Sequence, residues 1–122
     1  MNTREIGSAK EAVAAKYLAA RGLRVAEQNF RCRQGEIDIV GYHEGYLVFV
    51  EVKYRGSGSR GTALEAVGGR KQRRICRTAD YYRYLHHLGD NTPVRYDVLA
   101  IQGEDIRWIQ NAFPHVAAGN RY

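Results

Sequence analysis

The sequence has little of what a disulfide-stapled, secreted or membrane-spanning chain needs. Among its 122 residues the only cysteines are Cys32 and Cys76, which lie far apart and have no partners at metal-ligand spacing. They are predicted to be reduced thiols. Apolar runs such as residues 47–50 are far shorter than the ~20 residues that a bilayer-spanning helix requires. The opening residues 1–5 provide no apolar signal core, so we expect a cytoplasmic protein with no membrane partner.

Acidic residues are also scarce relative to basic ones. The chain has 19 lysines and arginines against 13 aspartates and glutamates, which gives a net charge of +6. The excess is concentrated between Lys53 and Arg77, where eight basic residues face one acid, Glu65. A solvated helix face normally mixes both signs, so this stretch predicts an anionic partner such as nucleic acid. The residues expected to contact it are Arg55, Arg60, Arg70, Lys71, Arg73, Arg74 and Arg77.

The overall composition is that of an ordinary globular domain. Hydrophobic residues make up 44% of the chain and charged residues 26%, and the length suits one domain with its own core. We expect a single domain over residues 1–113. Residues 114–122 carry no pattern and are predicted to be a loose tail.

Hydrophobic spacing predicts two helices and five strands. The expected helices cover residues 8–21 and 69–87, and the expected strands cover residues 23–29, 37–42, 46–54, 94–101 and 106–110. Ser8 and Glu11 form a capping-box pattern for the first helix, although a start near Asn2 or Thr3 is an alternative. A glycine-rich loop at residues 55–61 is expected to be mobile. The order predicts an α/β fold with a mixed central sheet flanked by helices.

The strand over residues 46–54 is apolar on both faces, which predicts a central position in a sheet covered on both sides. A two-residue hairpin loop at Glu44-Gly45 would place Asp38 opposite Glu51, with Lys53 on the same face as Glu51. Carboxylates this close repel each other unless one is protonated or a cation lies between them. A salt bridge at a sheet edge is the alternative, but the apolar strands around these charges favour a functional site.

This grouping has the chemistry of a phosphodiester-cleaving site. Asp38 and Glu51, with the Val52 carbonyl as a third ligand, could hold Mg²⁺ or Mn²⁺, which prefer hard oxygen ligands. The bound metal would shield phosphate charge and lower the pKa of water. Lys53 would orient the attacking water or meet the charge that grows on the phosphate.

At these residues the chain resembles a known family. Residues 35–40 (GEIDIV) and 47–53 (LVFVEVK) resemble the YraN-like family of small bacterial proteins, which is similar to archaeal Holliday-junction resolvases of the restriction-endonuclease-like superfamily. The likeness covers residues 7–113. It includes Gly7, Glu11, Tyr17-Leu18, Asn29-Phe30-Arg31, Ala66-Val67, Lys71, Tyr96-Asp97-Val98 and Asn111-Ala112-Phe113.

The resemblance implies an α-β-β-β-α-β core carrying a PD-(D/E)XK motif. Asp38, Glu51 and Lys53 stand at the motif's acidic and basic positions, and Ile37 stands where the motif has proline. The implied activity is endonucleolytic cutting of DNA, including branched or junction DNA. Resolvases also use a glutamate from the first helix, and Glu11 matches that place, so its role is open between the site and the helix cap.

Several functional alternatives stay open. The same fold and basic surface would suit a non-catalytic nucleic-acid-binding module, or more weakly a protein-interaction adaptor. RNA is also a candidate partner, because nothing in the sequence reads a 2′-hydroxyl, and a homodimer would suit a two-fold symmetric branched substrate. Tyr81, Tyr82 and Tyr84 could stack on bases, or they could form core or a dimer interface.

Overall fold

The computed structural model describes residues 3–55 and 67–117, with residues 3–9 described by their backbone alone. The elements are α1 (Thr3–Ala20), β1 (Arg24–Cys32), β2 (Gly35–His43), β3 (Tyr46–Arg55), α2 (Gly69–Leu85), β4 (Val94–Gln102) and β5 (Asp105–Phe113). This order confirms the predicted α/β fold and its α-β-β-β-α-β sequence of elements. Within the described residues, no helix combines the length and apolar character needed to cross a membrane.

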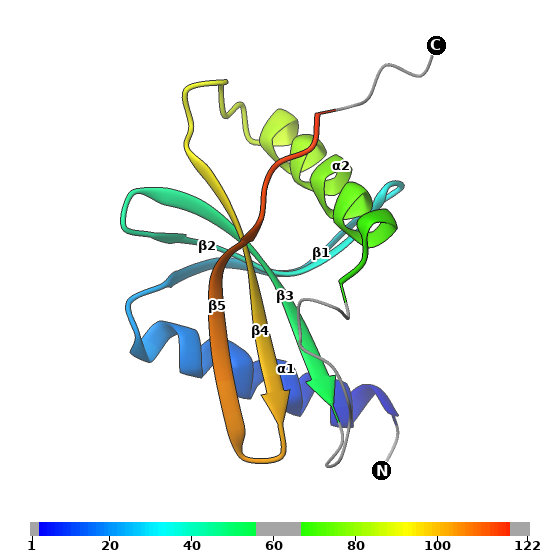
Figure 1. Ribbon diagram of the computed structural model, residues 1–122, viewed down its shortest axis with the longest axis vertical. Helices are drawn as coiled ribbons and strands as arrows, with labels where there is room; N and C mark the ends of the chain where they lie inside the picture. Colours follow the sequence, from blue (N-terminus) through cyan, green and yellow to red (C-terminus); the bar gives the residue numbers. More distant parts are fainter. Residues whose placement is uncertain (1–2, 56–66, 118–122) are drawn as a thin grey trace.

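The five strands form one mixed sheet in the order β1-β2-β3-β4-β5, in which only β3 and β4 run parallel. The helices α1 and α2 cover opposite faces of this sheet (Figure 1). Leu47 and Phe49 of β3 belong to the core cluster beneath α2, whereas Val48 and Val50 belong to the cluster beneath α1. The prediction of a central, doubly covered strand is therefore confirmed.

The β2–β3 hairpin has the predicted two-residue turn. Glu44 and Gly45 adopt φ values of 51° and 86°, as a type I′ turn requires. Strand pairing begins at His43–Tyr46 and continues to Ile39–Val50. The next residues along the two strands are Asp38 and Glu51, so the turn geometry brings these carboxylates to the same end of the sheet.

Several boundaries differ from the prediction, and the largest differences are at α1, β1 and β5. Helix α1 begins at Thr3, so Ser8 lies inside it and the predicted capping box is wrong, whereas the alternative start near Thr3 is confirmed. Strand β1 continues to Cys32, because its last residues pair with Glu36 and Gly35 across a two-residue turn. Strand β5 is longer than predicted, because its pairing with β4 resumes at Phe113 beyond a bulge.

The described part of the segment predicted as a tail, residues 114–117, has no regular secondary structure. It nevertheless contacts α2 and β4. Arg77 Nη2 donates a hydrogen bond to the Val116 carbonyl at 3.0 Å, and the Tyr96 hydroxyl lies 2.7 Å from His115 Nδ1. The first residues after β5 are thus attached to the domain.

Candidate functional site

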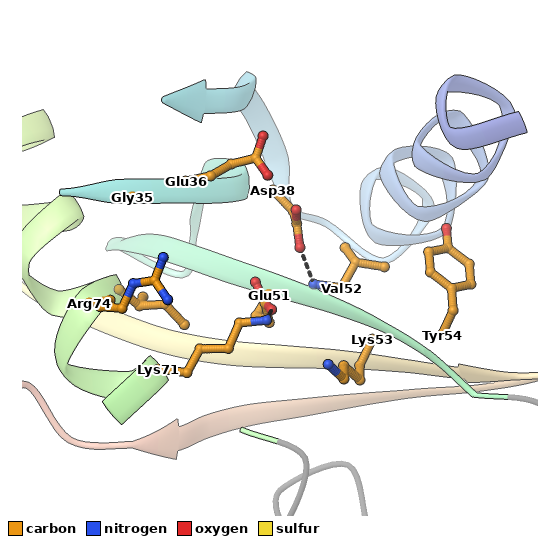
Figure 2. A pocket seen from close by; sticks show the side chains of 10 residues that line it. Gly35, Glu36, Asp38, Glu51, Val52, Lys53, Tyr54, Lys71 and Arg74 are labelled. Atoms are coloured by element: carbon orange, nitrogen blue, oxygen red, sulfur yellow. Dashed lines mark hydrogen bonds and ion pairs between the residues drawn. The ribbon is translucent and has the colours of Figure 1, made fainter. Parts of the chain in front are cut away.

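A pocket of about 440 Å³ opens where β2 begins, β3 ends and α2 starts. Its lining consists of Gly35, Glu36, Asp38, Glu51, Val52, Lys53, Tyr54, Lys71, Arg74 and Ile75 (Figure 2). The structure therefore brings together the three side chains that the sequence singled out, Asp38, Glu51 and Lys53. It also adds the first turns of α2, which contribute two basic side chains.

Asp38 is held at the end of the β2–β3 ladder by one backbone group. Its Oδ2 accepts a hydrogen bond of 2.7 Å from the Val52 amide (Figure 2). Burial, followed by the negative charge of Glu51, raises the pKa of the Asp38 carboxyl to about 7, although the Val52 N–H acts in the opposite direction. The structure thus keeps two mutually repelling carboxyl groups in a partly dry pocket.

Glu51 is more deeply buried, with 8% of its surface exposed. Its carboxylate forms an ion pair with the ammonium of Lys71, which reaches across from the first turn of α2 (Figure 2). Lys71 was predicted to contact nucleic acid, and in the structure its ammonium is paired with the Glu51 carboxylate. Sequence reasoning missed this pairing, for which the only signal was a lysine at the start of the second helix.

Lys53 and Tyr54 follow on β3 and point to different sides. Lys53 lines the pocket and is half-buried; within the described residues, no carboxylate forms an ion pair with its ammonium. The Tyr54 hydroxyl donates a hydrogen bond of 2.6 Å to the Lys10 carbonyl of α1. Lys53 is therefore available to an external anion, whereas Tyr54 ties the end of β3 to α1.

Glu11 does not line the pocket, and it is not part of a helix cap. Its Oε2 accepts a hydrogen bond of 2.7 Å from Asn29 Nδ2, and Asn29 itself adopts a left-handed conformation with φ 56° within β1. Burial raises the pKa of the Tyr54 hydroxyl, and the charges of Asp38 and Glu11 raise it further. Both carboxylates thus lie near Tyr54, which places Glu11 at the α1 side of the site.

The other predicted basic residues are distributed unevenly. Arg70, Arg73 and Arg74 are exposed on α2, and Arg74 reaches the pocket. Arg77 is occupied by the Val116 carbonyl, and Arg55 lines a separate groove beside Lys10. Arg60 and most of the predicted glycine-rich loop lie outside the described residues.

The residues present fit a small divalent cation. In the described part of the chain no three His, Cys, Asp or Glu side chains gather as a metal cluster, so a cation here would depend on Asp38, Glu51 and the Val52 carbonyl. Two carboxylates are the number that Mg²⁺ commonly takes from a protein, with water and phosphate oxygens completing its ligands. A cation would also offset the burial and the charge of Glu51, which together raise the pKa of Asp38.

Comparison with known proteins gives one consistent family. The model of the family described as "Uncharacterised protein family UPF0102" matches residues 10–101, which include both segments behind the resemblance to the YraN-like family and confirm it. A UPF0102 protein of Lachnoclostridium phytofermentans is 50% identical over 113 residues, covering 93% of this chain and 96% of the relative.

Two further relatives agree. A UPF0102 protein of Stutzerimonas stutzeri is 41% identical over 111 residues, covering 88% of this chain and 92% of the relative. One from Nitrosococcus oceani is 39% identical over 114 residues, covering 90% and 92%. The names of these relatives state the family and no activity.

Proposed function

We propose, from the premise that this chain belongs to the uncharacterised protein family UPF0102, that it is a metal-dependent endonuclease that hydrolyses phosphodiester bonds in DNA, including branched DNA. The observation that carries the proposal is the pairing of Asp38 with Glu51 inside a pocket that also contains Lys53. Buried carboxyl groups with a strongly perturbed pKa are typical of functional sites.

The carboxylate pair is difficult to explain as a structural feature. Burial and the charge of Glu51 raise the pKa of Asp38 to about 7, and the ammonium of Lys71 is paired with Glu51 and not with Asp38. Near neutral pH the charge of Asp38 is therefore poorly balanced by the described residues. Mg²⁺ or Mn²⁺ held by Asp38, Glu51 and the Val52 carbonyl would supply Lewis-acid shielding of the phosphate and a water of lowered pKa. The chain's own part is to hold these oxygen ligands at one point of the sheet.

The basic side chains around the pocket have separate tasks in this proposal. Lys53, which has no ion-pair partner within the described residues, meets the negative charge that develops on the phosphate oxygens or orients the attacking water. Arg74 at the pocket binds the substrate's backbone phosphate. Glu11 lies near Tyr54 on the α1 side of the site. Its carboxylate would act in the reaction together with those of Asp38 and Glu51.

The test is a cleavage assay on linear, nicked, flapped and four-way DNA and on structured RNA, each with Mg²⁺ or Mn²⁺. We expect the wild type to cut DNA, and Lys53→Ala to cut about 10²–10³-fold more slowly with little loss of binding, because a fixed charge at the reacting phosphate is removed. Lys16→Ala is the matched control, since Lys16 is an exposed lysine of α1 outside the pocket lining.

The outcomes separate the alternatives. If the wild type binds DNA but leaves every substrate intact with both metals, the non-catalytic binding module replaces the enzyme. If only RNA is cut, the substrate class is wrong. If Lys53→Ala and Lys16→Ala cut at equal rates, the pocket is not the site of the reaction.

A further inference from the structure

The outer face of α2 has an unusual order of side chains. The residues that α2 buries are Ile75, Cys76, Thr78, Ala79 and Tyr82. With 3.6 residues per turn, the stripe on the opposite side of the helix is narrow and contains four arginines followed by two tyrosines. This stripe, here called the α2 outer stripe, consists of Arg70, Arg73, Arg74, Arg77, Tyr81 and Tyr84.

The two tyrosines of the stripe are not part of the core. Tyr84 is 75% exposed and Tyr81 is 38% exposed, whereas Tyr82 between them is 4% exposed and packs edge-on against Phe30 and Phe49. The rings of Tyr81 and Tyr84 stack on each other with centroids 6.2 Å apart and an interplanar angle of 28°. The helix therefore presents paired aromatic surface to solvent at its C-terminal half.

The arginines connect this aromatic pair to the pocket. Arg74 lines the pocket, and Tyr81 lies seven residues further along α2, about 10 Å at a rise of ~1.5 Å per residue. Asp80, the acid that precedes Tyr81 in α2, is already engaged by Arg83 at 3.8 Å and His115 at 3.5 Å. The stripe is therefore positively charged near the pocket and aromatic further away.

We infer that the α2 outer stripe binds an unpaired DNA strand that leads away from the pocket, with its exposed arginines, Arg70, Arg73 and Arg74, on the phosphates and Tyr81 and Tyr84 stacked on the bases. The inference rests on the proposed function, because it places the strand's phosphate at the same pocket. A basic track with aromatic side chains is the arrangement that binds single strands without sequence preference. A duplex would use the arginines but would keep its base faces stacked inside.

A second copy of this chain is a weaker occupant for the same face. A two-fold contact through the stripe would bring the four arginines of each chain together. Within the described residues, the acid beside the stripe, Asp80, is already paired on its own chain. Charge complementarity therefore favours a polyanion over self-association.

The test measures binding of a fluorescein-labelled single strand, and of the duplex of the same sequence, by anisotropy in EDTA so that nothing is cut. We expect Tyr81→Ala with Tyr84→Ala to weaken single-strand binding about tenfold or more, because each stacked base is lost, and to change duplex binding by less than about twofold. Tyr81→Phe with Tyr84→Phe keeps the rings and should bind as the wild type. Tyr46→Ala is the control, since Tyr46 is 41% exposed on the β2–β3 hairpin.

Three results would overturn the inference: unchanged single-strand binding in the double alanine variant, equal loss for strand and duplex, or a loss as large in Tyr46→Ala. A wild-type dimer in sedimentation that dissociates in the alanine variant, with strand affinity unchanged, would assign the stripe to self-association instead. Because the binding test does not measure cleavage, a negative result would reject the single-strand site on α2 but not the proposed nuclease activity. A negative cleavage assay with Lys53→Ala would likewise reject the proposed activity but not the binding result.

Discussion

Two aspartates in this sheet, Asp97, which is fully buried, and Asp38, which is partly buried, differ in how the protein balances their charge. Asp97 of β4 is fully buried and accepts hydrogen bonds from Arg95 Nε at 2.9 Å and Nη2 at 2.8 Å. It also accepts one from Trp108 Nε1 at 2.8 Å and one from the Asn111 amide at 2.9 Å. Its carboxylate is thus fully satisfied by a cation and by neutral donors.

The carboxyl of Asp38 in β2, in contrast, lacks such a set of partners among the described residues. The Val52 amide donates a hydrogen bond to it at 2.7 Å, and the group beside it is the carboxyl of Glu51. Burial and that neighbouring charge raise its pKa to about 7. Lys71, which lines the same pocket, is paired with Glu51 rather than with Asp38.

The two carboxylates are therefore expected to contribute differently to stability. A buried polar network in which every member has a partner stabilises one arrangement of the chain. A buried carboxylate left short of partners lowers stability, and such conflicts in an otherwise consistent fold are typical of functional sites. The two aspartates should therefore respond to the same substitution with opposite signs.

The largest effect is expected at Asp97. Asp97→Asn removes the countercharge of the buried Arg95, and breaking one side of a buried ion pair costs about 3–5 kcal/mol. We expect urea denaturation to show this loss as a lower midpoint with an unchanged slope. Asp90→Asn, at a fully exposed aspartate, is the control; a loss below about 1 kcal/mol at Asp97 would contradict the comparison.

Asp38→Asn should have the opposite sign. The folded-state pKa of about 7 lies above the ordinary 3.8, so the stability that the protonated carboxyl contributes is complete below pH ~4 and is lost as the pH rises toward 7. Asparagine keeps an oxygen for the Val52 amide without the charge. We expect the variant to be more stable than the wild type by roughly 2–4 kcal/mol at pH 8 without metal.

The same variant should lose the proposed DNA cleavage, because it removes a ligand of the proposed metal. The two readouts therefore separate a functional carboxylate from a structural one. Urea midpoints at pH 4 and pH 8 check the pH dependence, with equal stability of variant and wild type expected at pH 4. A variant that is less stable than the wild type at pH 8 would show that Asp38 is a structural residue like Asp97.

Much of the Asp38–Glu51 arrangement could be predicted from the sequence because it is local. The Glu44-Gly45 turn determines the register of the hairpin, and a period of two then decides which residues face each other. The apolar residues on both faces of β3 likewise indicate its central place. Each of these inferences spans fewer than twenty residues of chain.

The features that were missed depend on contacts between distant elements. The pairing of Lys71 with Glu51 requires α2 to dock beside β3, which no local pattern specifies. The Asp97 network depends on a bulge between β4 and β5 that brings Trp108 and Asn111 to it. The capping-box prediction for Ser8 and Glu11 was wrong because the same residue pattern also occurs inside helices.

The smallest expected effect is the response of wild-type stability to Mg²⁺. At about ten times its dissociation constant, a ligand that binds only the folded state stabilises it by about 1.4 kcal/mol, or about 5 °C in Tm for a domain of this size. We expect this rise in the wild type at pH 8, because the cation offsets the repulsion between Asp38 and Glu51. Sodium chloride at matched ionic strength should not reproduce it. Asp38→Asn should lose the rise, whereas Asp90→Asn should keep it; a rise of equal size in both variants would mean that Mg²⁺ binds away from the carboxylate pair.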